Sequence, residues 1–324
     1  ASLGKYNEPL KLLWSEPEIN ETPVTLEVYR TDTVPFAGIA LQRNFSPNDD
    51  PDYGLMAFVG GAGHVHSHPS GMNMELYGLG EVLGAKTYGK SDEARNFAAG
   101  NTVIVNGYSR GEGDWKDFAI NTVQVAAMEP AARQAGVSSN ISFTCSLFVD
   151  DKGTGAEADQ QRTMAIIRTS PTTGYYVDLF RSDSSLGGEY HDYVYRNIGD
   201  SLSLEDDAGT PLSLSSAPNR FQNDTDEWNS PGWGFWTDTK VSATETNSVR
   251  ARFTTQPTGA PEPIYMDLHI PGDAAREYAT ALAPAVDDIS DPYDDLPIPA
   301  LSIRKNGEAW DRPFAVVYEP HHGT

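Results

Sequence analysis

The sequence predicts an all-β protein, an antiparallel β-sandwich with few short helices. Short runs rich in β-branched and aromatic residues recur along the chain. Turn residues separate them, and the 324 residues include 29 glycines and 22 prolines. Helical periodicity is scarce. Many strands with few helices are typical of two packed antiparallel sheets.

The predicted strands begin soon after residue 24 and continue to the end of the chain. Ser91 to Ala99 and Ala274 to Leu282 are the best candidates for short helices. The aromatic segment from Trp228 to Trp236 has two interpretations, stacking on sugar rings or packing between sheets. The strand-like runs are 25–30, 36–42, 102–106, 122–126, 141–149, 164–168, 174–180, 190–196, 249–254, 264–269 and 314–318.

Composition excludes several classes of protein. With 23 Lys and Arg against 46 Asp and Glu, the formal net charge is −23, so nucleic acid is not an expected partner. No apolar stretch reaches the roughly 18 residues that a membrane-spanning helix needs. Cys145 is the only cysteine, which excludes an intrachain disulfide. A single cysteine does not forbid export, and we expect a secreted or periplasmic bacterial protein.

Three of the seven histidines, His64, His66 and His68, lie within five residues. In an extended backbone this spacing sends all three to one face. Such a face suits proton transfer or metal binding. The segment continues into an alternating run in which Asn73 and Glu75 fall on the face of His66, where they would contact sugar hydroxyls or be ordinary polar strand positions.

Four blocks in this order resemble the heparinase II/III-like β-sandwich domain of polysaccharide lyases, a group that includes alginate, heparin and ulvan lyases. The first is His66-Ser67-His68 with Tyr77 at the spacing of that family. The others are Asn101 to Gly107, Glu189 to Tyr193, and Gly307 to Pro320. The resemblance extends from about residue 60 to residue 320.

The resemblance implies a polysaccharide lyase that cleaves a uronic-acid polysaccharide by β-elimination, with alginate and ulvan as the leading substrates. It implies catalytic roles for His66 and His191. It also places Tyr193 and Arg196 beside His191, and substrate binding is expected of Asn73, Glu75, Tyr193 and Arg196. Alternation puts Tyr193 and Tyr195 on the face of His191, and Tyr190 with Arg196 on the other.

In several members of the family the second histidine binds zinc, which makes His68 the candidate metal ligand. The sequence departs from the family here. The position of the aspartate ligand falls near Ala85 and Lys86, and Gly100 stands where the family has a histidine. Zinc requires about four ligands, and the matching positions supply one. Lys86 would place an ammonium where the ion lies in the family.

The resemblance also implies a partner. In the family an α/α-toroid domain precedes the β-sandwich and supplies further catalytic residues. We therefore interpret residues 1–24 as a connector from a missing N-terminal helical domain, and 25–324 as the β-sandwich domain. On this interpretation the chain provides half of a cleft and is inactive in isolation, the other half coming from a toroid domain or chain of the same enzyme.

Two other functions remain open from the sequence. A non-catalytic carbohydrate-binding or structural β-sandwich module is the main alternative. A metal-dependent hydrolase that uses the three histidines is a weaker hypothesis, because a carboxylate ligand is missing near them.

Overall fold

The computed structural model describes residues 29–44, 54–60, 72–86, 96–108, 123–148, 158–186, 188–221, 232–286, 289 and 292–323. It confirms the prediction of an all-β sandwich, and every pairing between described strands is antiparallel. The boundary predicted between residues 24 and 25 lies outside the described residues. None of the helices in the described part is long and apolar enough to span a membrane.

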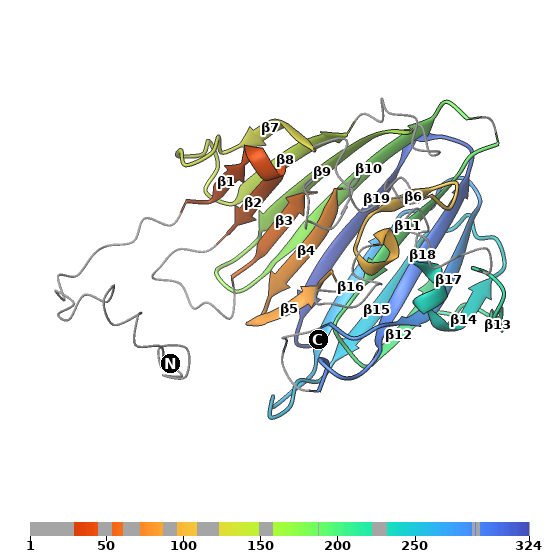
Figure 1. The fold of residues 1–324 in the computed structure, drawn as a ribbon. Helices are drawn as coiled ribbons and strands as arrows, with labels where there is room; N and C mark the ends of the chain where they lie inside the picture. The colour runs from red at the N-terminus through yellow and green to blue at the C-terminus, as the bar shows by residue number, and fades with distance from the viewer. Residues whose placement is uncertain are drawn as a thin grey trace, which may run out of the picture.

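One layer of the sandwich is an eight-stranded sheet in the order β12-β15-β16-β19-β10-β9-β8-β7 (Figure 1). Its long strands alternate buried and accessible residues, which is the pattern of a sheet with one face on the core. The strands are β7 (Gln124–Glu129), β8 (Ile141–Phe148), β9 (Ala158–Arg168), β10 (Gly174–Ser184), β12 (Ser201–Asp206), β15 (Val249–Thr255), β16 (Ile264–Ile270) and β19 (Ala309–His321).

The opposite layer consists of two sheets. A five-stranded sheet in the order β1-β2-β3-β4-β5 lies over β8 and β9. A six-stranded sheet in the order β13-β14-β17-β18-β11-β6 lies over the other half. The strands are β1 (Thr31–Val34), β2 (Ile39–Arg43), β3 (Met56–Gly60), β4 (Asn73–Gly78), β5 (Glu81–Gly84), β6 (Val103–Val105), β11 (Tyr190–Arg196), β13 (Leu214–Ser216), β14 (Thr237–Ser242), β17 (Arg276–Ala283) and β18 (Ile298–Asn306).

The two sheets of this layer meet where β5 and β11 end. A β-bridge pairs Gly84 with Asn197, and the amide of Ile198 donates to the carbonyl of Leu83 at 2.8 Å. The end of β5 therefore lies beside the end of β11. This junction brings together residues that are about 115 positions apart in the sequence.

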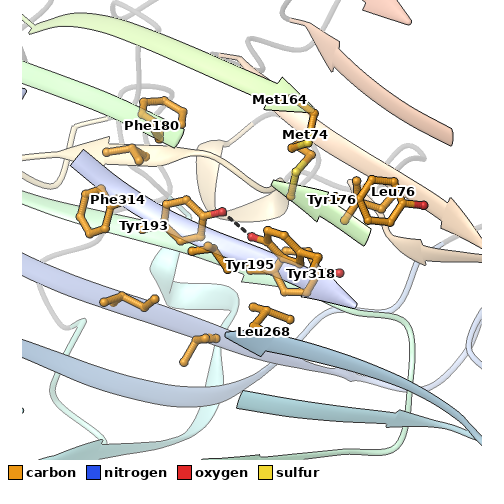
Figure 2. Close-up of a cluster of buried hydrophobic side chains, with 14 of the residues drawn as sticks. Met74, Leu76, Met164, Tyr176, Phe180, Tyr193, Tyr195, Leu268, Phe314 and Tyr318 are labelled. Atoms are coloured by element: carbon orange, nitrogen blue, oxygen red, sulfur yellow. Dashed lines mark hydrogen bonds between the residues drawn. The ribbon is translucent and has the colours of Figure 1, made fainter. Parts of the chain in front are cut away.

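The main core lies between the layers and is rich in tyrosine. Figure 2 shows Tyr193 and Tyr195 of β11 packed near Tyr318 of β19, with Phe314 on one side. The ring centroids of Tyr195 and Tyr318 are 4.9 Å apart, and those of Tyr193 and Phe314 are 5.3 Å apart. Burial raises the pKa of the Tyr193, Tyr195 and Tyr318 hydroxyls well above the usual value, so these groups stay protonated and need partners.

A second cluster covers the outer face of the six-stranded sheet. Phe221 stacks on Trp233 with their ring centroids 4.3 Å apart, and the ring of Trp236 contacts both of them edge-on. Their neighbours include Val194 of β11 and Ala300 of β18. The aromatic segment is therefore used for packing, although on the outside of one sheet and not between two. Trp228 lies outside the described residues.

The prediction of a helix at 274–282 is wrong. These residues form most of β17, which pairs with β14 and β18. The alanines favour a helix by intrinsic propensity, but Tyr278, Ala281 and Ala283 are buried in the sheet, and tertiary packing outweighs propensity. Of the helix predicted at 91–99, the described part contains a short 3-10 helix at Phe97–Ala99; two others lie at Pro35–Ala37 and Trp233–Phe235.

Candidate functional site

The outer face of β4 carries three polar or aromatic side chains. Met74 and Leu76 point into the core, so alternation puts Asn73, Glu75 and Tyr77 on the opposite face. The prediction that Asn73 and Glu75 share a face is confirmed, and the Asn73 amide donates to Glu75 Oε1 at 3.1 Å. Tyr77 lines a hollow of about 380 Å³ together with Tyr293.

The Asn73 side chain is held in one orientation. Its Oδ1 accepts the backbone N–H of Asn101 at 2.6 Å, while its Nδ2 donates to Glu75. Gly100 makes room for this arrangement, because a Cβ at residue 100 would lie 2.6 Å from Asn73 Oδ1. The glycine that stands in place of a family histidine is therefore required by the position of Asn73.

Asn101 joins β4 to β11. Its Nδ2 donates to the carbonyl of Met74 at 2.9 Å, and its Oδ1 accepts the backbone N–H of Arg196 at 2.7 Å. Arg196 has no exposed surface, and its guanidinium donates to the carbonyls of Ala99 and Pro284. The two predicted substrate-binding residues Asn73 and Arg196 are thus brought together through one asparagine.

Lys86 completes this cluster as a second internal cation. Its side chain is 3% exposed. Burial lowers the pKa of Lys86 to about 7; the Glu75 carboxylate opposes this lowering and the Arg196 guanidinium adds to it. We call Asn73, Glu75, Lys86, Asn101 and Arg196 the β4–β11 cluster. It contains one guanidinium, one carboxylate, and an amine whose pKa of about 7 leaves it partly protonated at neutral pH.

A buried ion pair lies behind the cluster. Arg162 of β9 donates to Asp178 of β10 at 3.0 and 2.6 Å. Its Nη1 donates to the carbonyls of Met72 and Asn101, at 2.7 and 2.6 Å. Arg162 therefore connects the eight-stranded sheet to the backbone at the start of β4.

Tyr193 belongs to this internal network. Its hydroxyl donates to Asp178 at 2.6 Å and is hydrogen-bonded to the Tyr318 hydroxyl (Figure 2). The side chain has no exposed surface. Its predicted contact with substrate stays a prediction, and the structure places it between the sheets.

His191 lies at the opposite end of β11 from Arg196, roughly 17 Å away at 3.3 Å per residue. It shares the face of Tyr193, as predicted from alternation. The imidazole has no exposed surface, and neither ring nitrogen has a hydrogen-bond partner among the described residues. Burial lowers the pKa of His191 to about 4; the nearby Lys305 adds to this lowering and Glu308 opposes it. His191 is therefore neutral at pH 7, and its catalytic role stays a prediction.

His64, His66 and His68 lie outside the described residues, so the structure does not test their predicted roles. The described residues on either side, Gly60 and Asn73, are register partners of β3 and β4. The described part contains no group of three or more His, Cys, Asp or Glu that fits a metal ion. Lys86 and Gly100 offer no zinc ligand, so the described residues do not fit the zinc site of the family.

Sequence reasoning did not assign roles to Asn101, Arg162 or Asp178. Asn101 was inside one of the four matching blocks, and this was the only signal that pointed to it. The Arg162–Asp178 pair has no local signature, since its contacts with Met72 and Asn101 span 90 and 61 residues of sequence.

The chain is similar in sequence to a known enzyme. No family model matches the chain. Over 97% of its length, however, the chain is 39% identical to an endo-acting ulvan lyase from Formosa agariphila. Over nearly its whole length the chain is thus similar to part of a polysaccharide lyase. It spans about 40% of the length of the ulvan lyase.

Solved polysaccharide lyases are similar at lower identity. The heparan sulfate lyase HepC from Pedobacter heparinus is 10% identical, with a TM-score of 0.46, over 91% of this chain and 37% of that one. A heparinase III, the BT4657 gene product, is 14% identical, with a TM-score of 0.46, over 93% and 37%. The resemblance to polysaccharide lyases that the four blocks predict is confirmed by the sequence match to the ulvan lyase.

Proposed function

We propose that this chain is the β-sandwich part of a lyase that cleaves ulvan by β-elimination. The observation that carries the proposal is the 39% identity to an endo-acting ulvan lyase over 97% of the chain. Alginate, the other substrate expected from the sequence, has no comparable support. We further propose secretion or export to the periplasm, because a polysaccharide substrate would lie outside the cytoplasm.

β-Elimination requires a base, an acid and groups that stabilise the negative charge of the uronate carboxylate. A base removes the proton on C5 of the uronate, the C4–O4 bond breaks with its electron pair going to the oxygen, and that oxygen takes up a proton. The product has a C4=C5 double bond. Negative charge builds on the uronate carboxylate, so cations and hydrogen-bond donors must stabilise it, and a base and an acid must stand within hydrogen-bond reach of C5 and O4.

The β4–β11 cluster supports substrate binding at the outer face of β4. Glu75, which is half-buried on this face, presents a carboxylate that suits sugar hydroxyls, and the buried Asn73 holds it through its amide. Lys86 and Arg196 supply positive charge in a chain whose net charge is −23, where a polyanion would otherwise be repelled. His66, predicted as a catalytic residue, precedes this strand by seven positions.

The second half of the cleft is also a proposal. The ulvan lyase is about two and a half times as long as the aligned part, since the chain spans 40% of it. We propose that a helical toroid domain or chain completes the site and supplies the remaining acid or base.

Ultraviolet absorbance tests this function, because the unsaturated uronate product absorbs near 235 nm. The full-length protein encoded by the gene should raise this absorbance with ulvan, and less or not at all with alginate, heparan sulfate or pectate. Binding of ulvan without any absorbance change would favour the non-catalytic carbohydrate-binding module. Neither binding nor cleavage of ulvan would overturn the proposal.

A further inference from the structure

The hollow at the end of β4 has no role in the proposed chemistry. Its volume of about 380 Å³ lies in the range of small-molecule sites in proteins. Tyr77 of β4 and Val82 of β5 are register partners, and both line the hollow. A two-residue turn at Leu79 and Gly80, both with positive φ, folds β5 back beside β4 and brings Val82 to this position.

Aromatic and aliphatic side chains form most of the wall of this hollow. Tyr293 is buried, and its hydroxyl donates to Asp200 Oδ2 and accepts the backbone N–H of Gln256, both at 2.8 Å. These two hydrogen bonds fix the Tyr293 side chain in place. Ile198 and Pro257, which are also buried, line the hollow as well. Tyrosine rings and aliphatic groups together present a surface on which the C–H face of a pyranose ring can pack.

Glu81 is the charged residue of the hollow. It is half-buried at the start of β5, and no lysine, arginine or histidine is among the described residues that line the hollow. A carboxylate accepts hydrogen bonds from sugar hydroxyls. It repels a carboxylate or sulfate of a glycan, and does so more strongly where solvent is excluded. The hollow is therefore better suited to an uncharged sugar ring than to a charged one.

The hollow lies next to the part of β4 that is proposed to bind the polysaccharide. Glu75 and Tyr77 are on the same face of β4 and two positions apart, which is about 7 Å at 3.3 Å per residue. A glycan that lies along this face with one sugar at Glu75 therefore reaches the hollow with a neighbouring sugar.

We propose that this hollow is a subsite for an uncharged sugar ring of the polysaccharide, which packs on Tyr77 and Tyr293 and donates a hydroxyl hydrogen bond to Glu81. The inference rests on the proposed function, because it assumes a glycan along the outer face of β4. The subsite selects polysaccharides in which an uncharged sugar lies near the uronate that is cleaved.

Two small glycosides test the charge preference of the hollow in the full-length protein. Methyl glucoside and methyl glucuronide have the same ring and differ only at C6, where the second has a carboxylate. In protein labelled with ¹³C-tyrosine, methyl glucoside should shift the ring resonances of Tyr77 and Tyr293 and bind about fivefold more tightly than methyl glucuronide. E81Q removes the charge and keeps the shape, so it should reduce this ratio. Equal or tighter binding of the glucuronide to wild type, or no shift of either tyrosine, would overturn the inference.

A substitution that fills the hollow tests its use in cleavage of the polysaccharide. Val82 is 39% exposed, so V82F adds a ring at the hollow without enlarging a core residue. It should raise KM for ulvan about two- to tenfold, the range for loss of one aromatic contact, and change kcat less than KM. V34F is the matched control, because Val34 is an exposed valine at the end of β1. An equal effect of the two variants on KM, or no effect of V82F, would contradict the subsite.

The outcomes separate the inference from the proposed function. If wild type cleaves ulvan but methyl glucoside does not shift the two tyrosines and V82F leaves KM unchanged, the inference is wrong and the function stands. If methyl glucoside binds at the tyrosines as expected but the protein neither binds nor cleaves ulvan, the proposed function is wrong and the hollow remains a site for an uncharged sugar.

Discussion

Asp178 and Arg162 form an ion pair in which neither side chain has any exposed surface. The guanidinium donates to both carboxylate oxygens, at 3.0 and 2.6 Å. It also donates to the carbonyls of Met72 and Asn101. The pair therefore fixes the backbone on which Asn73 and the β4–β11 cluster depend, and it does so from the opposite layer of the sandwich.

Loss of one member of this pair should be strongly destabilising. R162M leaves the Asp178 carboxylate buried and without its cation, and we expect a loss of about 3–5 kcal/mol in the free energy of unfolding. Urea denaturation followed by tryptophan fluorescence measures it. R181M is the matched control, since Arg181 lies on the exposed face of the neighbouring strand, and should change stability by less than about 0.5 kcal/mol. Equal losses in the two variants would contradict the role of the pair.

The buried position of Tyr193 predicts an effect on stability and none on substrate binding. Y193F removes a hydroxyl that binds Asp178 and Tyr318, so unfolding should require about 1–3 kcal/mol less free energy. KM for ulvan should stay unchanged, because the hydroxyl has no exposed surface. Y175F, on the outer face of β10 in the opposite layer, serves as the control. A raised KM with unchanged stability would support the contact with substrate that the sequence predicts.

Local patterns predicted the parts of the fold in which alternation and strand propensity agree. The strand predicted at 190–196 is β11 with the same bounds, and its two faces divide as alternation requires. The segment 274–282 failed because its alanines favour a helix, whereas pairing with β14 and β18 decides its structure. A pattern within nine residues contains no information about those distant partners.

In the candidate site, too, contacts within one strand were predictable from the sequence and contacts between distant residues were not. Alternation within β4 placed Asn73 and Glu75 together, because both belong to one strand. The link from Asn73 to Arg196 through Asn101 was not predictable, since it depends on hydrogen bonds between residues 28 and 95 positions apart. His191 and Arg196 are separated because they lie near opposite ends of β11. This separation follows from the length of the predicted strand.

The buried His191 predicts an acid sensitivity that can be measured. Its pKa is about 4 in the folded chain and about 6.5 when unfolded. Between these values the unfolded state binds the extra proton, so stability falls as the pH is lowered from 6.5 to 4. The effect amounts to at most about 3 kcal/mol.

H191F keeps an aromatic ring and removes this titration, so it should flatten the dependence of unfolding free energy on pH in that window. Val105, the register partner of His191, provides the control: V105A should lower stability at every pH and leave the slope in place. An unchanged slope in H191F would assign the acid sensitivity to other groups.

The resemblance to polysaccharide lyases predicts that His66 is essential. H66A in the full-length protein should lower turnover of ulvan by about 10²–10⁴-fold, the range for loss of a general acid or base, with little change in unfolding temperature. H322A is the control, because His322 is exposed at the end of the described chain. Elemental analysis of wild type and H68A tests the zinc prediction. Turnover retained in H66A would remove this residue from the site.

The packing of Gly100 against Asn73 predicts a non-additive pair of substitutions. G100A is compatible with the extended backbone of residue 100, but its Cβ would lie 2.6 Å from Asn73 Oδ1. The Asn73 amide must then move and lose its hydrogen bond with Asn101. We expect a loss of about 1–3 kcal/mol in stability and weaker binding of ulvan.

The N73A background separates this contact from a general effect of the methyl group. With the amide removed, the nearest remaining atom of residue 73 is Cβ, 3.7 Å from the Cβ of an alanine at residue 100, which is an ordinary van der Waals distance. G100A should therefore be nearly neutral in N73A, and the cycle measures the coupling by urea denaturation. If G100A lowers stability equally in both backgrounds, Gly100 is not what positions Asn73, and the β4–β11 cluster owes its geometry to Asn101 and to the Arg162–Asp178 pair.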